Sequence, residues 1–150
     1  MKVVVDTNVF VSAVFFGGIP GRLLGMWRDG ALELLLTAEI LAECKDVVHR
    51  LRGRYPAVDP DPIIHLIVRR GTFVQPAPMA EPVCTDPDDD KFIAAALGGA
   101  AKTVVSGDTH LRAVSGYRQI RVMSPAQFVK LYGSKPAAGT DPAKGGPAQP

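Results

Sequence analysis

The residues in this sequence best suited to chemistry are acidic, and they stand at four well separated places. Asp6 follows a run of three valines, Glu43 lies in the segment TAEILAECKDVVHRL, and Asp108 follows the run TVVSG. The fourth place is the segment TDPDDDKFIAAAL, whose acids are Asp86, Asp88, Asp89 and Asp90. Two carboxylates 4 Å apart repel by about 4 kcal/mol at an effective dielectric near 20, and a proton or a bound cation relieves the repulsion. Oxygen ligands without cysteine or a well-placed histidine suit a hard ion, Mg²⁺ or Mn²⁺.

Each of these places also has a purely structural interpretation. Asp6 and Asp108 directly precede expected helices, and an acid there can be an N-cap or a first-turn residue. Asn8 is the better N-cap candidate for the first helix, which leaves Asp6 less explained by capping. Glu43 lies about 40° from Val47 on a helical wheel, at the edge of an apolar stripe, where a partly exposed glutamate is common.

The acidic cluster suits the start of an Ala-rich helix, because Pro87 and acids favour a first turn. One cap and one first-turn acid would meet that need, so four acids exceed it. A calcium-binding EF-hand loop starting at Asp86 is excluded, because Lys91 stands where that loop needs glycine and Leu97 where it needs glutamate.

The segments around the acids alternate between strand and helix. Ser124 and Pro125 suit the N-cap and first position of the last helix. We expect strands over 2–5 and 31–35 and in GTFVQP, KTVVS and YRQIRVM, and helices over 8–16, 20–27, 37–51, 61–70, 88–97 and in SPAQFVKLYG. This alternation predicts an α/β fold with a mostly parallel sheet. Ligands bind outside the carboxyl ends of such strands, so Asp6 and Asp108 can face one crevice.

Composition limits the class of protein. With 47% hydrophobic residues, the chain can bury a core and predicts one domain over residues 1–133. The tail, residues 134–150, is rich in Pro, Gly and Ala and predicts disorder. We find neither an apolar run of about 18–20 residues for a membrane span nor a signal-peptide leader. The two cysteines form no C-x-x-C pair, which argues against a zinc site and fits a reducing cytoplasm. The net charge of +2 permits nucleic-acid binding without arguing for it.

Four motifs, in this order and spacing, resemble those of PIN domains: VVVDTNVFVSA, TAEILAEC, DPDDDKFIAAAL and VVSGDTHL. They are most similar to the bacterial and archaeal branch regarded as toxins of toxin–antitoxin pairs. Each motif is weak by itself, but the ordered set is specific, and the resemblance runs from Val3 to about Leu131. It implies a Rossmann-like, three-layer α/β/α fold with a mostly parallel central sheet. It also implies a metal-dependent ribonuclease that leaves a 5′-phosphate and a 3′-hydroxyl.

The resemblance also implies which residues act. The acidic quartet is Asp6, Glu43, Asp90 and Asp108, with Asp6, Asp90 and Asp108 as metal ligands. Asp90 is chosen because the family places its acid directly before a helical run like KFIAAA, and Asp88 and Asp89 could share or replace that role.

Polar helpers follow from the same resemblance. Asn8 would orient Asp6, and Ser106 stands where Thr or Ser precedes the glycine and the last acid. Thr37 stands where this branch usually has Ser and keeps a capping hydroxyl. One or two Mg²⁺ or Mn²⁺ ions would activate a water for in-line attack on the RNA phosphodiester. RNA would also need basic contacts at the cleft rim, and the candidates, each equally well a solvated surface charge, are Arg50, Arg52, Arg54, Lys91 and Arg112.

Two other functions are compatible with parts of this pattern. A phosphotransferase of the haloacid-dehalogenase type would use Asp6 as nucleophile, but that pattern needs D-x-D, and Asn8 cannot act as a general acid. A non-catalytic PIN-fold protein would bind RNA or a partner, although the presence of all four acids argues against lost catalysis.

A toxin would have an antitoxin partner, bound as a peptide or helix over the crevice. The apolar helices around 9–16 and 23–27 could support a homodimer. Phe15, Phe16 and Trp27 could equally be core residues.

Overall fold

A parallel five-stranded sheet, in the order β3-β2-β1-β4-β5, forms the centre of the computed structural model, which describes residues 1–133. The expected disorder of residues 134–150 lies outside the described residues. The strands are β1 (Lys2–Val5), β2 (Glu33–Leu36), β3 (Thr72–Phe73), β4 (Thr103–Val105) and β5 (Arg121–Met123). The helices are α1 (Thr7–Phe16), α2 (Gly18–Arg28), α3 (Ala38–Arg52), α4 (Asp61–Arg70), α5 (Asp90–Gly98), α6 (Thr109–Arg112) and α7 (Pro125–Phe128). Short 3₁₀ turns span Pro87–Asp89 and Tyr117–Gln119, and a π-helical turn spans Val129–Gly133.

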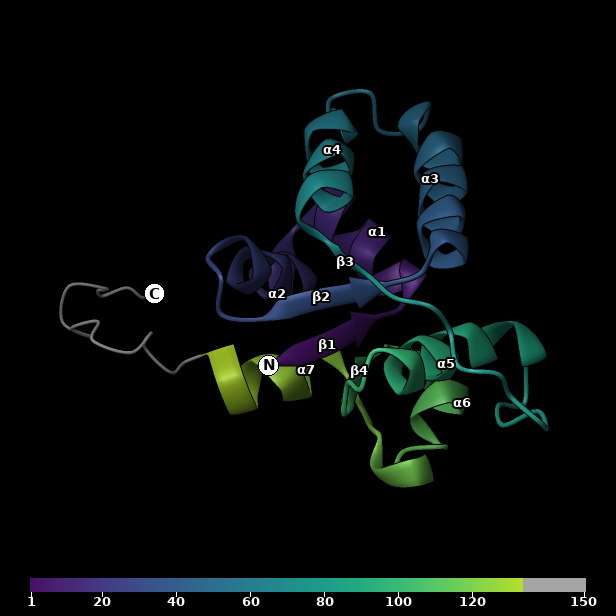
Figure 1. The fold of residues 1–150 in the computed structure, drawn as a ribbon. Helices are drawn as coiled ribbons and strands as arrows, with labels where there is room; N and C mark the ends of the chain where they lie inside the picture. The colour runs from purple at the N-terminus through teal and green to yellow at the C-terminus, as the bar shows by residue number, and fades with distance from the viewer. Residues whose placement is uncertain (134–150) are drawn as a thin grey trace, which may run out of the picture.

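Helices cover both faces of this sheet, as the expected three-layer fold requires (Figure 1). On β2, Leu34 lies against apolar residues of α1 and α2. The next residue, Leu35, points to the opposite face, where its side chain lies beside Gly99 at the end of α5. All three leucines of β2 are buried, and so are the three valines of β1. Continuous apolar runs of this kind are typical of parallel strands covered on both faces.

The sheet brings the ends of β1 and β4 together. Val5 pairs with Val105 in parallel register, and the residues that follow are Asp6 and Ser106. The same register continues outward, since Val105 also pairs with Met123 of β5. This parallel register therefore places Asp6 and Ser106 side by side at the carboxyl ends of β1 and β4.

The ends of several elements differ from the sequence predictions. Asp6, and not Asn8, is the N-cap of α1, because its carboxylate accepts the Val9 N–H. The expected strand in YRQIRVM shortens to β5, because Arg118 and Gln119 adopt positive φ angles of 48° and 68° in a 3₁₀ turn. The helix expected over 88–97 begins as a 3₁₀ turn before α5.

Other local predictions are confirmed. Ser124 caps α7 in a capping box with Gln127, with Pro125 at the first helical position. Phe15 and Trp27 belong to the hydrophobic core, whereas Phe16 is 60% exposed and meets the ring of Tyr55 edge-on. Within residues 1–133 no single helix has the length and apolarity of a membrane span; only α1 and α2 taken together, bent by 97°, reach them.

Candidate active site

Asp6 lies at the carboxyl end of β1 and is 5% exposed. Its Oδ1 accepts the Val9 N–H at 3.0 Å, and its Oδ2 accepts the hydroxyl of Ser106. Burial raises the pKa of this carboxyl, the hydrogen bond from Ser106 opposes that effect, and the charge of Asp108 adds to it. Asp6 is therefore both a helix cap and a buried carboxylate whose charge is disfavoured, so the capping interpretation accounts for only one of its oxygens.

Ser106 connects the two strand-end acids. Its side chain is fully buried at the end of β4. The hydroxyl donates to Asp6 and accepts the backbone N–H of Asp108 at 3.0 Å. Asp108 then caps α6 by accepting the His110 N–H at 2.9 Å, and the Nδ1 of His110 lies 3.5 Å from its carboxylate. One serine thus fixes the relative position of Asp6 and Asp108.

A hollow of about 380 Å³ opens beside these two acids. Asn8 and Ser12 line it from α1, and Gly107 and Pro125 line it from the other half of the sheet. The Asn8 side chain is exposed toward this space, and the recorded side-chain hydrogen bond to the Asp6 carboxylate comes from Ser106. The polar helper expected at position 106 touches Asp6, and the one expected at position 8 lines the hollow.

Of the three consecutive acids Asp88, Asp89 and Asp90, it is Asp89 that lies beside Asp108. The pKa of Asp89 is raised to about 6, first by partial burial and then by the charges of Asp108, Asp86 and Asp6 and a hydrogen bond with Asp108.

Asp90 points elsewhere. Its carboxylate accepts the backbone N–H of Cys84 at 2.7 Å and that of Val83 at 3.1 Å. Burial raises the pKa of Asp90, but hydrogen bonds from the Cys84 thiol and from these two backbone groups outweigh it and leave the pKa below its ordinary value. Asp90 therefore holds the proline-rich loop that precedes the 3₁₀ turn. The sequence predicts instead that its carboxylate faces the metal site.

Glu43 reaches the same region from α3, but its carboxylate is already occupied. Oε1 accepts the hydroxyl of Thr7, and Oε2 accepts the ammonium of Lys91 at 3.0 Å. The same ammonium lies 3.0 Å from Oδ1 of Asp88. Sequence reasoning missed Thr7 and assigned Lys91 to RNA. The only available signal was their position, Thr7 beside the strand-end acid and Lys91 directly after three acids.

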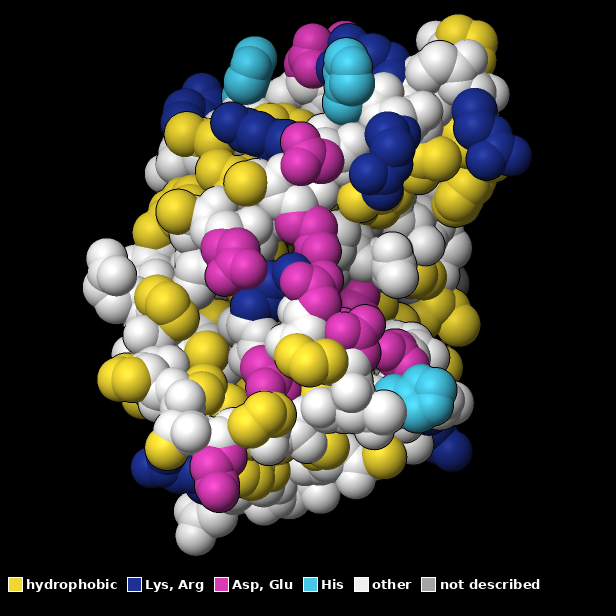
Figure 2. All heavy atoms as spheres, turned by 90° about the vertical axis from the view of Figure 1, so that its right-hand side faces the viewer, with side chains coloured by type: hydrophobic (Ala, Val, Ile, Leu, Met, Phe, Trp, Pro, Cys, Tyr) yellow, Lys and Arg dark blue, Asp and Glu magenta, His cyan; other side chains and the backbone are white. Residues whose placement is uncertain are grey.

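The basic residues expected to bind RNA do not form one patch at the acids. Lys91 is only 8% exposed. At a rise of 1.5 Å per residue, Arg50 stands about 10 Å beyond Glu43 along α3. Arg52 pairs with Asp61. The Nε of Arg112 is buried without a hydrogen-bond partner among the described residues. Figure 2 shows acidic side chains in a band across this face and basic and histidine side chains along its upper edge.

The acids fit a divalent cation by their chemistry. Among residues 1–133, no three Asp, Glu, His or Cys side chains already surround one point closely enough to hold an ion. Asp6, Asp89 and Asp108 nevertheless offer carboxylate oxygens. Burial, and after it the charge of neighbouring acids, raises the pKa of Asp6 and of Asp89, and a bound cation would favour their charged forms. Side-chain rotation at the half-buried Asp89 and Asp108 would be needed to complete such a site.

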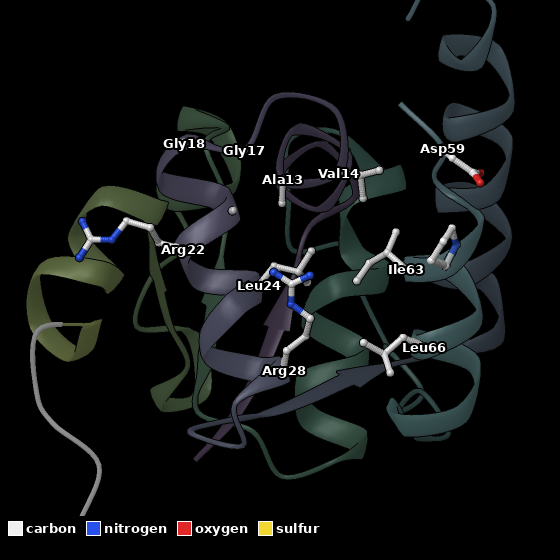
Figure 3. Close-up of a pocket in the computed structure, with 12 residues that line it drawn as sticks. Ala13, Val14, Gly17, Gly18, Arg22, Leu24, Arg28, Asp59, Ile63 and Leu66 are labelled. Carbon is white, nitrogen blue, oxygen red and sulfur yellow. The ribbon is translucent and has the colours of Figure 1, made fainter. Parts of the chain in front are cut away.

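A larger cavity lies away from these acids. It is a groove of about 580 Å³ between α1, α2 and α4, lined by apolar residues together with Arg22, Arg28 and Asp59 (Figure 3). The groove and the hollow beside Asp6 have no lining residue in common. The two are therefore separate features of the surface.

Comparison with known proteins gives two findings. A family model described as PIN domain matches residues 2–110, which include all four acidic places. The chain is also 30% identical over 146 residues to an uncharacterized protein of Methanocaldococcus jannaschii, covering 88% of this chain and 92% of the relative.

Proposed function

This chain belongs to the PIN domain family, whose members are generally nucleases that use divalent metal ions, and we propose that it hydrolyses single-stranded RNA with Mg²⁺ or Mn²⁺. The observation that carries the proposal is the meeting of Asp6, Asp89 and Asp108. These three carboxylates come from the end of β1, the 3₁₀ turn before α5 and the loop after β4, and the charge of Asp108 contributes to the raised pKa of both Asp6 and Asp89. A neutral hydroxyl, Ser106, is the link between two of them.

In this proposal Asp6, Asp89 and Asp108 hold the ion, and Asp89 replaces Asp90 among the ligands expected from sequence. A bound Mg²⁺ or Mn²⁺ supplies a water of lowered pKa and stabilises negative charge on the phosphate. Ser106 keeps Asp6 and Asp108 in register. Asn8 and Ser12 give the hollow amide and hydroxyl groups that can bind a phosphate or sugar. The arginines at the end of α3 would bind the RNA at nucleotides farther from the scissile phosphodiester bond.

The direct test is cleavage of a fluorescently labelled single-stranded RNA with Mn²⁺ or Mg²⁺. We expect cleavage by the wild type, none in EDTA, and none by Asp6→Asn. The matched control is Asp46→Asn, which removes an exposed carboxylate on α3 that makes no hydrogen bond or ion pair within residues 1–133. This variant should cleave like the wild type. Cleavage that survives EDTA and Asp6→Asn would refute the proposal.

A second test needs no RNA. A ligand that binds only the folded state raises stability by RT ln(1 + [L]/Kd), about 2.7 kcal/mol at one hundred times Kd. Mn²⁺ should therefore raise the melting temperature of the wild type. It should raise that of Asp6→Asn/Asp108→Asn much less. Equal shifts in the two proteins would remove these residues from the metal site.

We further propose that the enzyme is the toxin of a toxin–antitoxin pair and works as a homodimer with a protein antitoxin. A neighbouring reading frame for a small DNA-binding protein, and its copurification with this chain, would support that role. A non-catalytic RNA- or partner-binding protein is the alternative. It would bind RNA without cutting it in the presence of Mn²⁺.

A further inference from the structure

The acidic site contains a cation of its own, the ammonium of Lys91. It is held by two carboxylates, at 3.0 Å from Glu43 Oε2 and 3.0 Å from Asp88 Oδ1. Only 8% of the Lys91 side chain is exposed, although lysine is almost never buried unless it is paired. In Figure 2 a basic side chain lies enclosed within the band of acidic side chains.

The ammonium occupies a place where two carboxylates converge. Glu43 Oε2 and Asp88 Oδ1 each lie 3.0 Å from the Nζ atom of Lys91, so the two carboxylate oxygens are separated by at most twice 3.0 Å. Glu43 cannot turn freely out of this arrangement, because its other oxygen accepts the Thr7 hydroxyl. Glu43 and Asp88 are thereby neutralised without a metal ion.

The remaining acids differ from this pair. Asp6 and Asp89 have no lysine or arginine within ion-pair distance among residues 1–133, and Asp108 has only the side chain of His110. The crevice therefore divides into a half that carries a tethered cation and a half that does not. A divalent ion beside Glu43 would meet both the occupied oxygens and the repulsion of the ammonium.

We propose that Lys91 fills the position that a second metal ion would take, so that the site binds a single divalent ion at Asp6, Asp89 and Asp108. This inference rests on the proposed function, because it concerns how the proposed nuclease holds its metal. Lys91 is a positioning residue: it contacts Glu43 and Asp88 and acts on metal binding through them.

The test is the number of Mn²⁺ ions bound per chain, measured by titration calorimetry and by the electron paramagnetic resonance of free Mn²⁺. Wild type should bind about one ion. Lys91→Met should bind about two, because Glu43 and Asp88 lose their cation. Lys91→Arg, which keeps the charge, should bind one. The double variant Lys91→Met/Glu43→Gln should return to one, because the second ion would lose a carboxylate.

Each outcome bears on the inference. Two ions in wild type, or one ion in Lys91→Met, would overturn it while leaving the nuclease proposal intact. No Mn²⁺ binding by wild type would overturn the metal-dependent function and this inference together. If Lys91→Met does not fold, Lys91→Gln carries the same expectation of two ions, and the wild-type count is decisive even without a variant.

Discussion

Asp89 and Asp90 are neighbours in sequence with opposite electrostatic surroundings, so replacing each by asparagine should change stability in opposite directions. The Asp90 carboxylate is stabilised in the folded protein by N–H donors, and its pKa is lowered. The Asp89 carboxylate is destabilised by burial and by neighbouring acids, and its pKa is raised to about 6. In the absence of divalent ions, Asp90→Asn should therefore destabilise the fold and Asp89→Asn should stabilise it.

The size of the Asp90 effect follows from its hydrogen bonds. Two backbone N–H groups, at 2.7 and 3.1 Å, donate to the two oxygens of a charged acceptor, and hydrogen bonds to charged groups contribute about 1.5–3 kcal/mol. An asparagine keeps one acceptor oxygen and turns an NH₂ group toward the other N–H. We expect a loss of about 2 kcal/mol at pH 7.5. Because the folded-state pKa of Asp90 is lowered, this stabilisation is present above the ordinary value and is lost as the pH falls through the folded-state value.

The Asp89 effect has the opposite sign and its own pH window. The difference between about 6 and the ordinary 3.8 corresponds to at most about 3 kcal/mol, and solvent screening of a half-exposed group reduces this to about 1 kcal/mol. In the pH range between the two values the folded state binds more protons than the unfolded state, so wild-type stability falls as the pH rises. The gain from Asp89→Asn should be near zero at pH 4 and complete above pH 6.

Urea unfolding in EDTA at pH 4.5, 6 and 7.5 measures both effects. Trp27 is the only tryptophan and is 3% exposed, so its fluorescence reports loss of the core. Asp46→Asn serves as the control for removing one negative charge from the surface. The reasoning is refuted if, at pH 7.5, Asp89→Asn is less stable than wild type or Asp90→Asn is as stable as wild type.

Three further outcomes follow from the same structure. Mn²⁺ should raise the melting temperature of Asp90→Asn about as much as that of wild type, whereas Asp89→Asn should lose most of the shift; the reverse result would restore Asp90 as the ligand. Ser124→Ala should lower the free energy of unfolding by about 1 kcal/mol in urea titrations, because it removes the capping box of α7, while Ser124→Thr should stay close to wild type. Gly98→Ala should cost at least about 1–3 kcal/mol in the same assay, because its Cβ would lie 1.9 Å from the Gln75 carbonyl oxygen; an unchanged midpoint would contradict that close packing.

Much of the fold could be predicted because its determinants are local. The runs VVV and TVV are buried on both faces of the sheet, and Ser124 with Gln127 makes a capping box within four residues. Where prediction failed, the cause was a backbone conformation that residue type does not favour. Arg118 and Gln119 have positive φ angles, which are uncommon for residues other than glycine, and they shorten the last strand.

The site was predictable to the level of segments and no further. Strand ends in a parallel sheet place Asp6 and Asp108 together, so that convergence could be expected from sequence. The choice between Asp89 and Asp90 depends on the 3₁₀ turn that precedes α5 and on the loop at Val83 and Cys84. Neither feature is visible in the pattern of acids. The family resemblance names Asp90, with Asp88 and Asp89 as residues that could share or replace its role, and which of them binds the metal stays a prediction.

Long-range contacts explain what sequence reasoning missed. Thr7 reaches Glu43 across 36 positions, and Lys91 reaches it across 48. If acids are only counted, all four places appear to contribute equally to a metal site. The contacts show that Glu43 differs from the other three places, because its carboxylate already has a hydroxyl and an ammonium as partners. Thr7 and Lys91 satisfy Glu43, while burial and neighbouring acids, Asp108 among them, raise the pKa values of Asp6 and Asp89. Because a cation binds most strongly where negative charge is least compensated, the distribution of partners, more than the number of acids, selects the place for a divalent ion.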